Sequence, residues 1–263
     1  MMGVFYKTPW LLRLFGGDSD IWFSDGAIKG RVCLQLVRLC PLLLVETRSL
    51  KRFFEQRGVR RCVWYPNTRV AFSEGDAANL RPRLNRCSLN LVYIGRVTET
   101  KGVFQAIEAV ASLGKTASLV IFGPLECELP RELPPNVKYS GLLDSSQVTK
   151  TISNFDALLL PTFYRGEGYP GVIIEALSVG VPVISTRWRA IPELLNVRCW
   201  MLSDPGSASS LTESIGLLRQ ALIDEPEALA KDCVATANRF DGHVWARVFL
   251  RLCRNLSASP NYY

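Results

Sequence analysis

The sequence contains little histidine and no closely paired cysteines. Its 263 residues include one histidine, His243, and eight cysteines that lie far apart, without a Cys-x2-Cys pair. Because protein metal sites need ligands at short spacing, this pattern predicts no metal. Several cysteines fall within apolar runs, where a free thiol behaves as a small hydrophobic group. We therefore expect reduced cysteines in the core of a cytoplasmic protein.

Long apolar runs and a convincing signal peptide are absent as well. The nearest candidate for a membrane span, Val32–Val45, has 14 residues and contains Arg38 and Pro41. A spanning helix needs about 20 apolar residues. The segment fits better as a helix, a turn at Pro41 and a buried strand at 42–45. With 48% hydrophobic and 21% charged residues, the composition is that of an ordinary globular protein.

Positive charge is concentrated near the amino end. Residues 1–86 contain 15 Lys/Arg and 7 Asp/Glu, whereas the remainder contains 16 and 17. Membrane headgroups, a phosphorylated lipid or nucleic acid would suit such a basic surface. A solvated, arginine-rich helix face explains the same charge without any partner, so the charge alone leaves these alternatives open.

From Leu89 onward, short apolar runs alternate with amphipathic stretches, which is typical of a parallel sheet covered by helices. The expected strands are 89–94, 118–122, 137–140, 157–160 and 181–185. The expected helices are 102–113, one that starts at 145–146, 170–179, 207–223, 226–240 and 243–256. Nearer the amino end we expect strands at 42–45 and 63–65 around a helix at 50–57 that is capped by Ser49. The polar segment 68–86 is the expected linker, so the sequence predicts an α/β protein with domains at 1–86 and 87–263.

The segment 161–185 contains the densest set of candidate site residues. Glu167 follows the expected strand 157–160, at the strand end where open α/β sheets bind ligands. Glycines and Pro170 then lead into a helix whose unpaired N–H groups favour an anion. Glu175 lies in the first turns of that helix. Acidic residues that merely stabilise a helix start would also fit this pattern.

The order of several motifs resembles one enzyme family. Glu167 and Glu175 in EGYPGVIIE resemble the Glu-x7-Glu motif of family 4 retaining glycosyltransferases of the GT-B fold, the glycosyl transferases group 1. The flanking PTFYRGEGYPG, EALSVGVPVIST and WRAIPELL are similar to that family too. Gly95-Arg96 followed by Lys101-Gly102 resembles the family's first strand-to-helix loop in the carboxy-terminal domain. The helices 226–240 and 243–256 resemble those that cross back onto the amino-terminal domain.

The resemblance implies a GT-B-type α/β fold with a complete carboxy-terminal Rossmann-like domain and a partial amino-terminal one. It implies a catalytic group in which Arg96 and Lys101 bind the donor diphosphate and Glu167 holds the donor sugar. Glu175 would bind the nucleotide ribose. The implied donor-binding residues are Gly95, Gly168, Tyr169, Pro170, Gly171 and Glu175.

The implied reaction moves a sugar from a nucleotide diphosphate to an acceptor hydroxyl, with retention at the anomeric carbon. No metal or other cofactor is expected. The expected partners are a nucleotide sugar and a sugar or lipid-linked acceptor, with peripheral contact at the inner face of the cytoplasmic membrane; nucleic acid is not expected. Asp18-Ser19-Asp20 also resembles the Asp-x-Asp motif of metal-dependent GT-A enzymes. Nothing downstream fits a GT-A sheet, so we expect a turn after Gly16-Gly17.

The amino-terminal part departs from the family. About 86 residues precede the second domain, where a full amino-terminal domain has ~100–200, and the early strands are expected to be absent. His243, the only histidine, is expected to start a helix and not to act in catalysis. Three hypotheses follow: a truncated active transferase, a half-enzyme completed by a partner chain, or a non-catalytic protein that binds nucleotide sugars.

Overall fold

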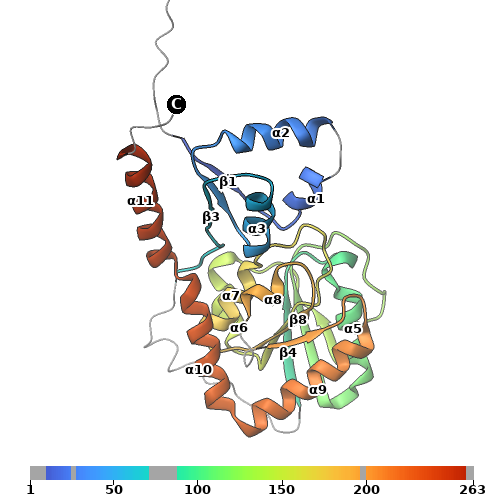
Figure 1. Ribbon diagram of the computed structural model, residues 1–263. Coiled ribbons are helices and arrows are strands. Elements are labelled where there is room, and N and C mark those ends of the chain that lie inside the picture. The colour runs from blue at the N-terminus through green and yellow to red at the C-terminus, as the bar shows by residue number, and fades with distance from the viewer. Residues whose placement is uncertain (1–9, 25–27, 71–87, 196–199, 259–263) are drawn as a thin grey trace, which may run out of the picture.

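The computed structural model describes residues 10–24, 28–70, 88–195 and 200–258, which form two parallel sheets with helices around them (Figure 1). The smaller sheet has the order β1-β2-β3, with β1 at Leu12–Leu14, β2 at Leu43–Val45 and β3 at Cys62–Trp64. The larger sheet has the order β6-β5-β4-β7-β8-β9. Its strands are β4 (Leu89–Ile94), β5 (Ala117–Phe122), β6 (Val137–Tyr139), β7 (Ala157–Leu159), β8 (Val183–Thr186) and β9 (Trp200–Ser203).

The larger sheet is built from strands that are apolar on both faces. In β4, Leu91, Val92 and Tyr93 are all fully buried, as expected for a central parallel strand between two helical layers. Around the sheet, α5 packs against α9, and α7 packs against α10. The helices are α5 (Val103–Ser112), α6 (Val148–Ile152), α7 (Gly171–Ser178), α8 (Ile191–Leu194), α9 (Ala208–Asp224) and α10 (Pro226–Ala237). Because all strands are parallel, their carboxyl ends share one edge, and the loops there define the candidate site.

The smaller sheet places three more loops near that edge. Its strands are also parallel, with Leu43 aligned to Leu12 on one side and to Cys62 on the other. One face packs on Leu50 and Phe54 of α3 (Arg48–Gln56). The helices α1 (Ser19–Ser24) and α2 (Ile28–Arg38) connect β1 to β2. The carboxyl ends of these strands therefore present the loops that begin at residues 15, 46 and 65.

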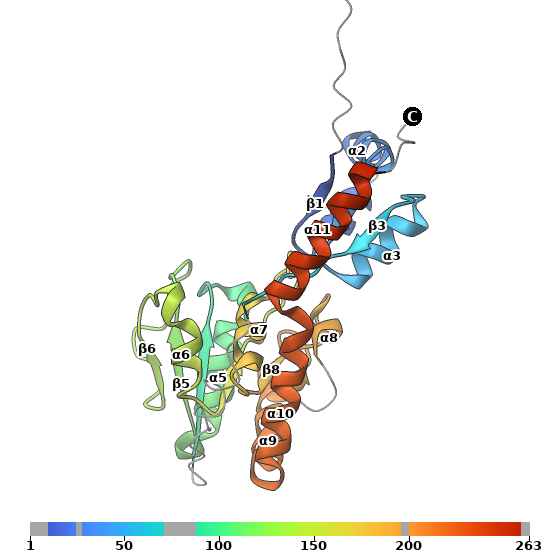
Figure 2. The ribbon, with the colours of Figure 1, turned by 90° about the vertical axis from the view of Figure 1, so that its left-hand side faces the viewer.

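The last helix joins the two parts. In Figure 2, α11 (Gly242–Ala258) leaves the end of α10 beside the larger sheet and runs along the smaller one. Trp245 lies edge-on to both Trp64 and Tyr65, with ring centroids 5.1 and 5.4 Å apart. Leu256 joins the apolar cluster that contains Leu42. The chain therefore crosses between the two parts twice, after β3 and after α10.

Several local expectations were wrong. The strands β1 and β9 and the short helices α1 and α8 were not predicted, because elements of three to six residues give too little periodicity to detect. The cap of α3 is Thr47, whose Oγ1 accepts the Leu50 N–H at 3.1 Å, and not Ser49. The α/β fold itself is confirmed. The proposed boundary at 86/87 and most of the linker 68–86 lie outside the described residues.

The described cysteines are all free thiols, namely Cys33, Cys40, Cys62, Cys127, Cys233 and Cys253. Burial raises the pKa of Cys62 to about 12, so this thiol is protonated at neutral pH. Within the described part of the chain, no helix combines the length and the apolar character needed to cross a bilayer.

Candidate functional site

The centre of the site is an ion pair between two residues that the sequence placed there. Lys101 Nζ lies 2.6 Å from Glu167 Oε2, and their side chains are 14% and 8% exposed. The hydroxyl of Thr162 donates to the same carboxylate oxygen at 2.6 Å. A carboxylate so deeply buried needs such partners, because an unpaired charge would cost several kcal/mol. The ammonium of Lys101 and the hydroxyl of Thr162 therefore hold the Glu167 carboxylate in one orientation.

A tight backbone contact brings Lys101 to this position. Thr98 caps the 3-10 turn Glu99–Lys101 by accepting the Lys101 N–H at 3.3 Å. Gly102 follows with φ of 77°, and a Cβ there would lie 2.0 Å from the carbonyl oxygen of Pro161. Only glycine allows the loop after β4 to touch the loop after β7 so closely. This contact places Lys101 within reach of Glu167.

Arg96 lies beside this pair without touching Glu167. Its Nη1 is 3.2 Å from Glu126 Oε2, and its side chain is 45% exposed. The Arg96 Cζ and Lys101 Nζ lie 5.1 and 4.9 Å from the centroid of the Tyr164 ring. A Cβ on Gly123 would lie 1.8 Å from the carbonyl oxygen of Gly95, so the two backbones are in close contact. The loop after β4 thus presents two cations, of which the outer one remains accessible.

Tyr93 supports the loop after β4 through a hydrogen bond. It is fully buried, and its hydroxyl donates to the carbonyl oxygen of Arg96 at 2.8 Å. Burial raises the pKa of Tyr93, and the negative charge of Glu167 raises it further. The phenol therefore stays neutral and acts as a hydrogen-bond donor.

Glu175 interacts with an arginine that the sequence did not indicate. Its Oε1 pairs with Nε of Arg69, 106 residues earlier in the chain. The guanidinium lies against Gly171, the first residue of α7, where a Cβ would be 1.6 Å from Arg69 Nη2. Pro170, extended at φ −60° and ψ 122°, is the helix cap. A guanidinium and a helix amino terminus together form a strongly positive corner, with the Glu175 carboxylate beside it.

Three hydrogen bonds hold Tyr169 in place. Its N–H donates to Oε1 of Glu46 at 2.6 Å, and its carbonyl accepts from the side chain of Asn67 at 3.0 Å. Its hydroxyl donates to Glu193 Oε2 at 2.9 Å. Burial raises the pKa of the phenol, and the charge of Glu193 adds to this. Tyr169 was expected to bind the donor, and in this structure its N–H is bonded to Glu46.

Loops of the smaller sheet meet the Glu167 loop directly. A Cβ on Gly17 would lie 1.7 Å from the carbonyl oxygen of Glu167, so the two backbones are in close contact. Arg189, which has a positive φ of 48°, donates to the carbonyl oxygen of Gly17 and pairs with Asp20. A turn was expected after Gly16-Gly17, but the structure begins the helix α1 there: the carbonyl of Asp18 accepts the N–H groups of Ile21 and Trp22 at 2.9 and 3.1 Å.

Glu193 links the same two parts at the start of α3. It accepts the N–H groups of Arg48 and Ser49 at 2.8 and 2.9 Å and also pairs with the Ser49 hydroxyl. A carboxylate at a helix amino terminus is favoured by the exposed N–H groups and by the helix dipole. Glu193 in WRAIPELL therefore joins α8 to α3.

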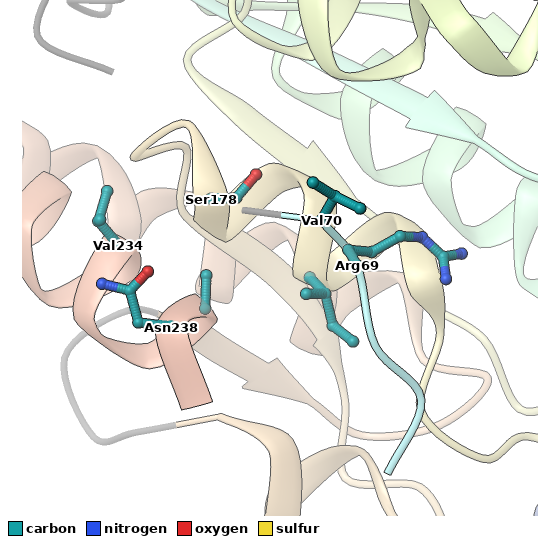
Figure 3. A pocket seen from close by; sticks show the side chains of 7 residues that line it. Arg69, Val70, Ser178, Val234 and Asn238 are labelled. Carbon is teal, nitrogen blue, oxygen red and sulfur yellow. The ribbon is translucent and has the colours of Figure 1, made fainter. Parts of the chain in front are cut away.

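Two of the cavities among the described residues are lined by none of the expected donor-binding side chains. The one in Figure 3, of about 10 Å³, lies between Arg69, Ser178 and Asn238 and is large enough for at most about one water molecule. The Arg69 guanidinium points away from it (Figure 3). The other, of about 360 Å³, lies near Arg60 and Leu252, remote from Glu167. Within the described residues, no group of three or more His, Cys, Asp or Glu side chains could hold a metal ion.

Sequence reasoning missed four residues that meet at this site: Glu46, Arg69, Arg189 and Glu193. A signal existed for Glu46, because it directly follows a fully buried parallel strand. His243 is exposed at the start of α11, and its N–H donates to Asp241 Oδ1 at 2.6 Å, as expected of a helix-start residue.

Two parallel α/β units whose strand-end loops meet around a buried carboxylate and two cations define a protein of the GT-B class. Solved structures share this fold. Sucrose-phosphate synthase from Thermosynechococcus elongatus superposes with a TM-score of 0.73 at 18% identity, over 97% of this chain and 69% of that one. HepE of Anabaena, solved with UDP and glucose, gives 0.70 at 19% identity, over 95% and 72%.

The chain belongs to the glycosyl transferases group 1 family, which matches residues 88–220, just over half of its length. TuaC of Bacillus subtilis, named for teichuronic acid biosynthesis, is 28% identical over 89% of this chain. AmsK of Erwinia amylovora, an amylovoran biosynthesis glycosyltransferase, is 28% identical over 64%. The chain spans 61% and 45% of the lengths of these two relatives.

Proposed function

We propose that this protein transfers a sugar from a nucleotide diphosphate to an acceptor hydroxyl, with retention at the anomeric carbon. The observation that supports this most directly is the buried Lys101–Glu167 pair at the strand-end edge, with Arg96 beside it. The ammonium and the guanidinium neutralise the diphosphate as its bond to the sugar breaks. Glu167 accepts hydrogen bonds from the sugar hydroxyls, and Glu175 binds the ribose beside Arg69. The spacing of the two glutamates, shared with retaining enzymes, supports retention.

In this mechanism the acceptor oxygen forms a bond to the anomeric carbon while the bond to the diphosphate oxygen breaks. The departing phosphate oxygen takes the acceptor proton, so no protein base is required. The protein contributes position and charge. We propose that Lys101 and Arg96 supply the positive charge at the phosphates and that no metal ion takes part.

The acceptor is proposed to be a growing polysaccharide or a lipid-linked sugar. The names of TuaC and AmsK, which refer to the biosynthesis of teichuronic acid and of amylovoran, support this class. The donor is a nucleotide diphosphate sugar, and the structure of HepE with UDP and glucose makes UDP the first nucleotide to test.

We further propose that the protein acts in the cytoplasm, at the surface of an anionic membrane. One face of α2 carries three exposed apolar residues at a spacing of four. They are Ile28, Val32 and Leu36, which are 81, 52 and 59% exposed. Lys29 and Arg31 are exposed beside them. An apolar stripe next to cations matches the interface of an anionic bilayer. Binding to phosphatidylglycerol vesicles, lost in Val32→Glu/Leu36→Glu and weak with phosphatidylcholine, is the expected result. Equal binding to both vesicles would contradict it.

A panel of nucleotide diphosphate sugars tests the transferase itself. We expect one donor to raise the melting temperature and to be turned over with a sugar acceptor, because a ligand stabilises the state that it binds. The product should keep the anomeric configuration of the donor by proton NMR. Should donors bind without turnover, even with candidate acceptors, the alternative of a non-catalytic or partner-dependent half-enzyme that binds nucleotide sugars would replace this proposal. No binding by any donor would reject both.

A further inference from the structure

Glu46 is a buried carboxylate that the reaction proposed above does not use. It follows β2, is only 5% exposed, and belongs to the smaller sheet. Its Oε1 accepts the N–H of Tyr169 at 2.6 Å, and its Oε2 accepts the N–H of Gly16 at 2.8 Å. A Cβ on Gly168 would lie 2.6 Å from Oε1. One carboxylate therefore touches the Gly16 loop of its own part and the loop that begins at Glu167.

The partners of Glu46 are main-chain amides and not a salt-bridged cation. Among the ion pairs of residues 10–24, 28–70, 88–195 and 200–258, none includes Glu46. Burial lowers the pKa of the Arg13 guanidinium, and the neighbouring Tyr65 and Glu46 oppose this shift only in part. A buried carboxylate is tolerated when strong N–H donors satisfy its oxygens. The orientation of Glu46 therefore depends on the two amides, and the amides depend on Glu46.

The amide that Glu46 holds is two residues from Glu167. The other main-chain polar group of Tyr169 accepts from Asn67, so both are bonded to the amino-terminal part. Between them, Gly168 has no side chain with which to anchor the loop. The N–H of Glu167 is bonded within its own loop, to the carbonyl of Tyr164 at 3.0 Å. The distal half of this loop is thus positioned from across the boundary between the two sheets.

We propose that Glu46 is a positioning residue for sugar transfer: it holds the Glu167–Tyr169 loop in its reactive geometry from the amino-terminal part. This inference rests on the proposed function of Glu167. Glu46 acts through the backbone and does not touch the donor. Its loss leaves Lys101 and Arg96 in place for the nucleotide but lets the sugar-binding carboxylate move. The expected effect is on turnover more than on nucleotide affinity.

The first test needs no donor. Hydrogen exchange of peptides that cover residues 162–171 is compared in the wild type, Glu46→Gln and Glu46→Ala. We expect faster exchange of this loop in Glu46→Ala and an intermediate rate in Glu46→Gln, because glutamine keeps one acceptor oxygen for two N–H groups. Glu55→Gln is the matched control: Glu55 is exposed and pairs with Lys51 within α3. Unchanged exchange in Glu46→Ala would overturn the proposal, even if sugar transfer is established.

The second test separates kcat from binding in the folded protein. With the donor found in the panel, Glu46→Ala should lower kcat about tenfold to hundredfold, as a displacement of ~1 Å can do. The Kd for UDP, or for the matching free nucleotide, should change less than about threefold, which is within the variation of a single hydrogen bond. Glu46→Gln should recover part of kcat. An affinity for the nucleotide sugar that rises in Glu46→Ala would identify Glu46 as a competitor for the Tyr169 amide and overturn the proposal. If wild type binds no donor, the proposed function fails, whereas the exchange result still decides whether Glu46 holds the loop.

Discussion

Two buried carboxylates meet at the site, and they are stabilised in different ways. Glu167 has a cation, Lys101, and a hydroxyl, Thr162, both from its own part of the chain. Glu46 has two backbone N–H groups, one of them 123 residues away in the other part. The larger unit thus assembles its charged centre by itself, whereas the smaller unit depends on how the two fit together. The charged centre and the position of the loop therefore have separate structural origins.

The largest expected effect comes from removing the cation of the first carboxylate. Lys101→Met should lower kcat/KM by about 10²- to 10³-fold, as loss of one stabilising group typically does. It should also destabilise the fold, by about 3–5 kcal/mol, because a buried carboxylate loses its partner. Adding Glu167→Gln should restore stability but not activity, and Lys115→Met, at an exposed lysine, should change neither. Full activity in Lys101→Met would show that the pair is only structural.

An added methyl group at the contact between the two units should have the next largest effect. In Gly17→Ala the new Cβ meets the backbone of Glu167, so one of the two loops must move. We expect kcat to fall about tenfold or more with donor and acceptor at saturation. The control Gly216→Ala adds a methyl in open space on α9, and should leave kcat unchanged and stabilise the helix by about 0.5–1 kcal/mol. Equal kinetics in the two variants would mean that contact at Gly17 is not needed for transfer.

The ion pair between Arg189 and Asp20 measures how strongly the units are coupled. A double-mutant cycle with Arg189→Met and Asp20→Asn, followed by urea unfolding, should give a coupling energy of about 1 kcal/mol, reduced from that of a fully buried pair by partial exposure. The coupling should weaken with added salt. A value of zero would show that this pair does not couple the units and that other contacts between them, such as those of Glu46 and Glu193, do so.

A third buried carboxylate, remote from the site, provides the smallest effect. Asp156 is 2% exposed and accepts the N–H of Asn90 at 2.7 Å. Burial raises the pKa of Asp156, and that N–H offsets only part of the shift. The ionised form therefore lowers stability at neutral pH, and this cost disappears as pH falls through the raised pKa. Asp156→Asn should melt slightly higher than wild type at pH 7, with the difference shrinking in acid. A difference in melting temperature that stays constant across pH would refute this prediction.

Much of the larger unit could be predicted from the sequence. Most of its strands are apolar runs, and the residues of the centre, Lys101 and Glu167, lie in the loops that follow β4 and β7. Neighbouring parallel strands bring their carboxyl ends together, so local pattern and topology were enough. The smaller unit was harder to predict, because β1 has three residues, one of them Arg13, and gives no clear alternation.

The sequence by itself determined the parallel α/β fold, the Glu167 loop at its strand ends and the two cations nearby. Only the tertiary structure decided that Glu46 holds Tyr169, that Arg69 pairs with Glu175 and that Arg189 reaches Asp20. These contacts join residues more than 100 positions apart. Each forms only where the two units meet, and the periodicity of a single strand or helix contains no information about that geometry.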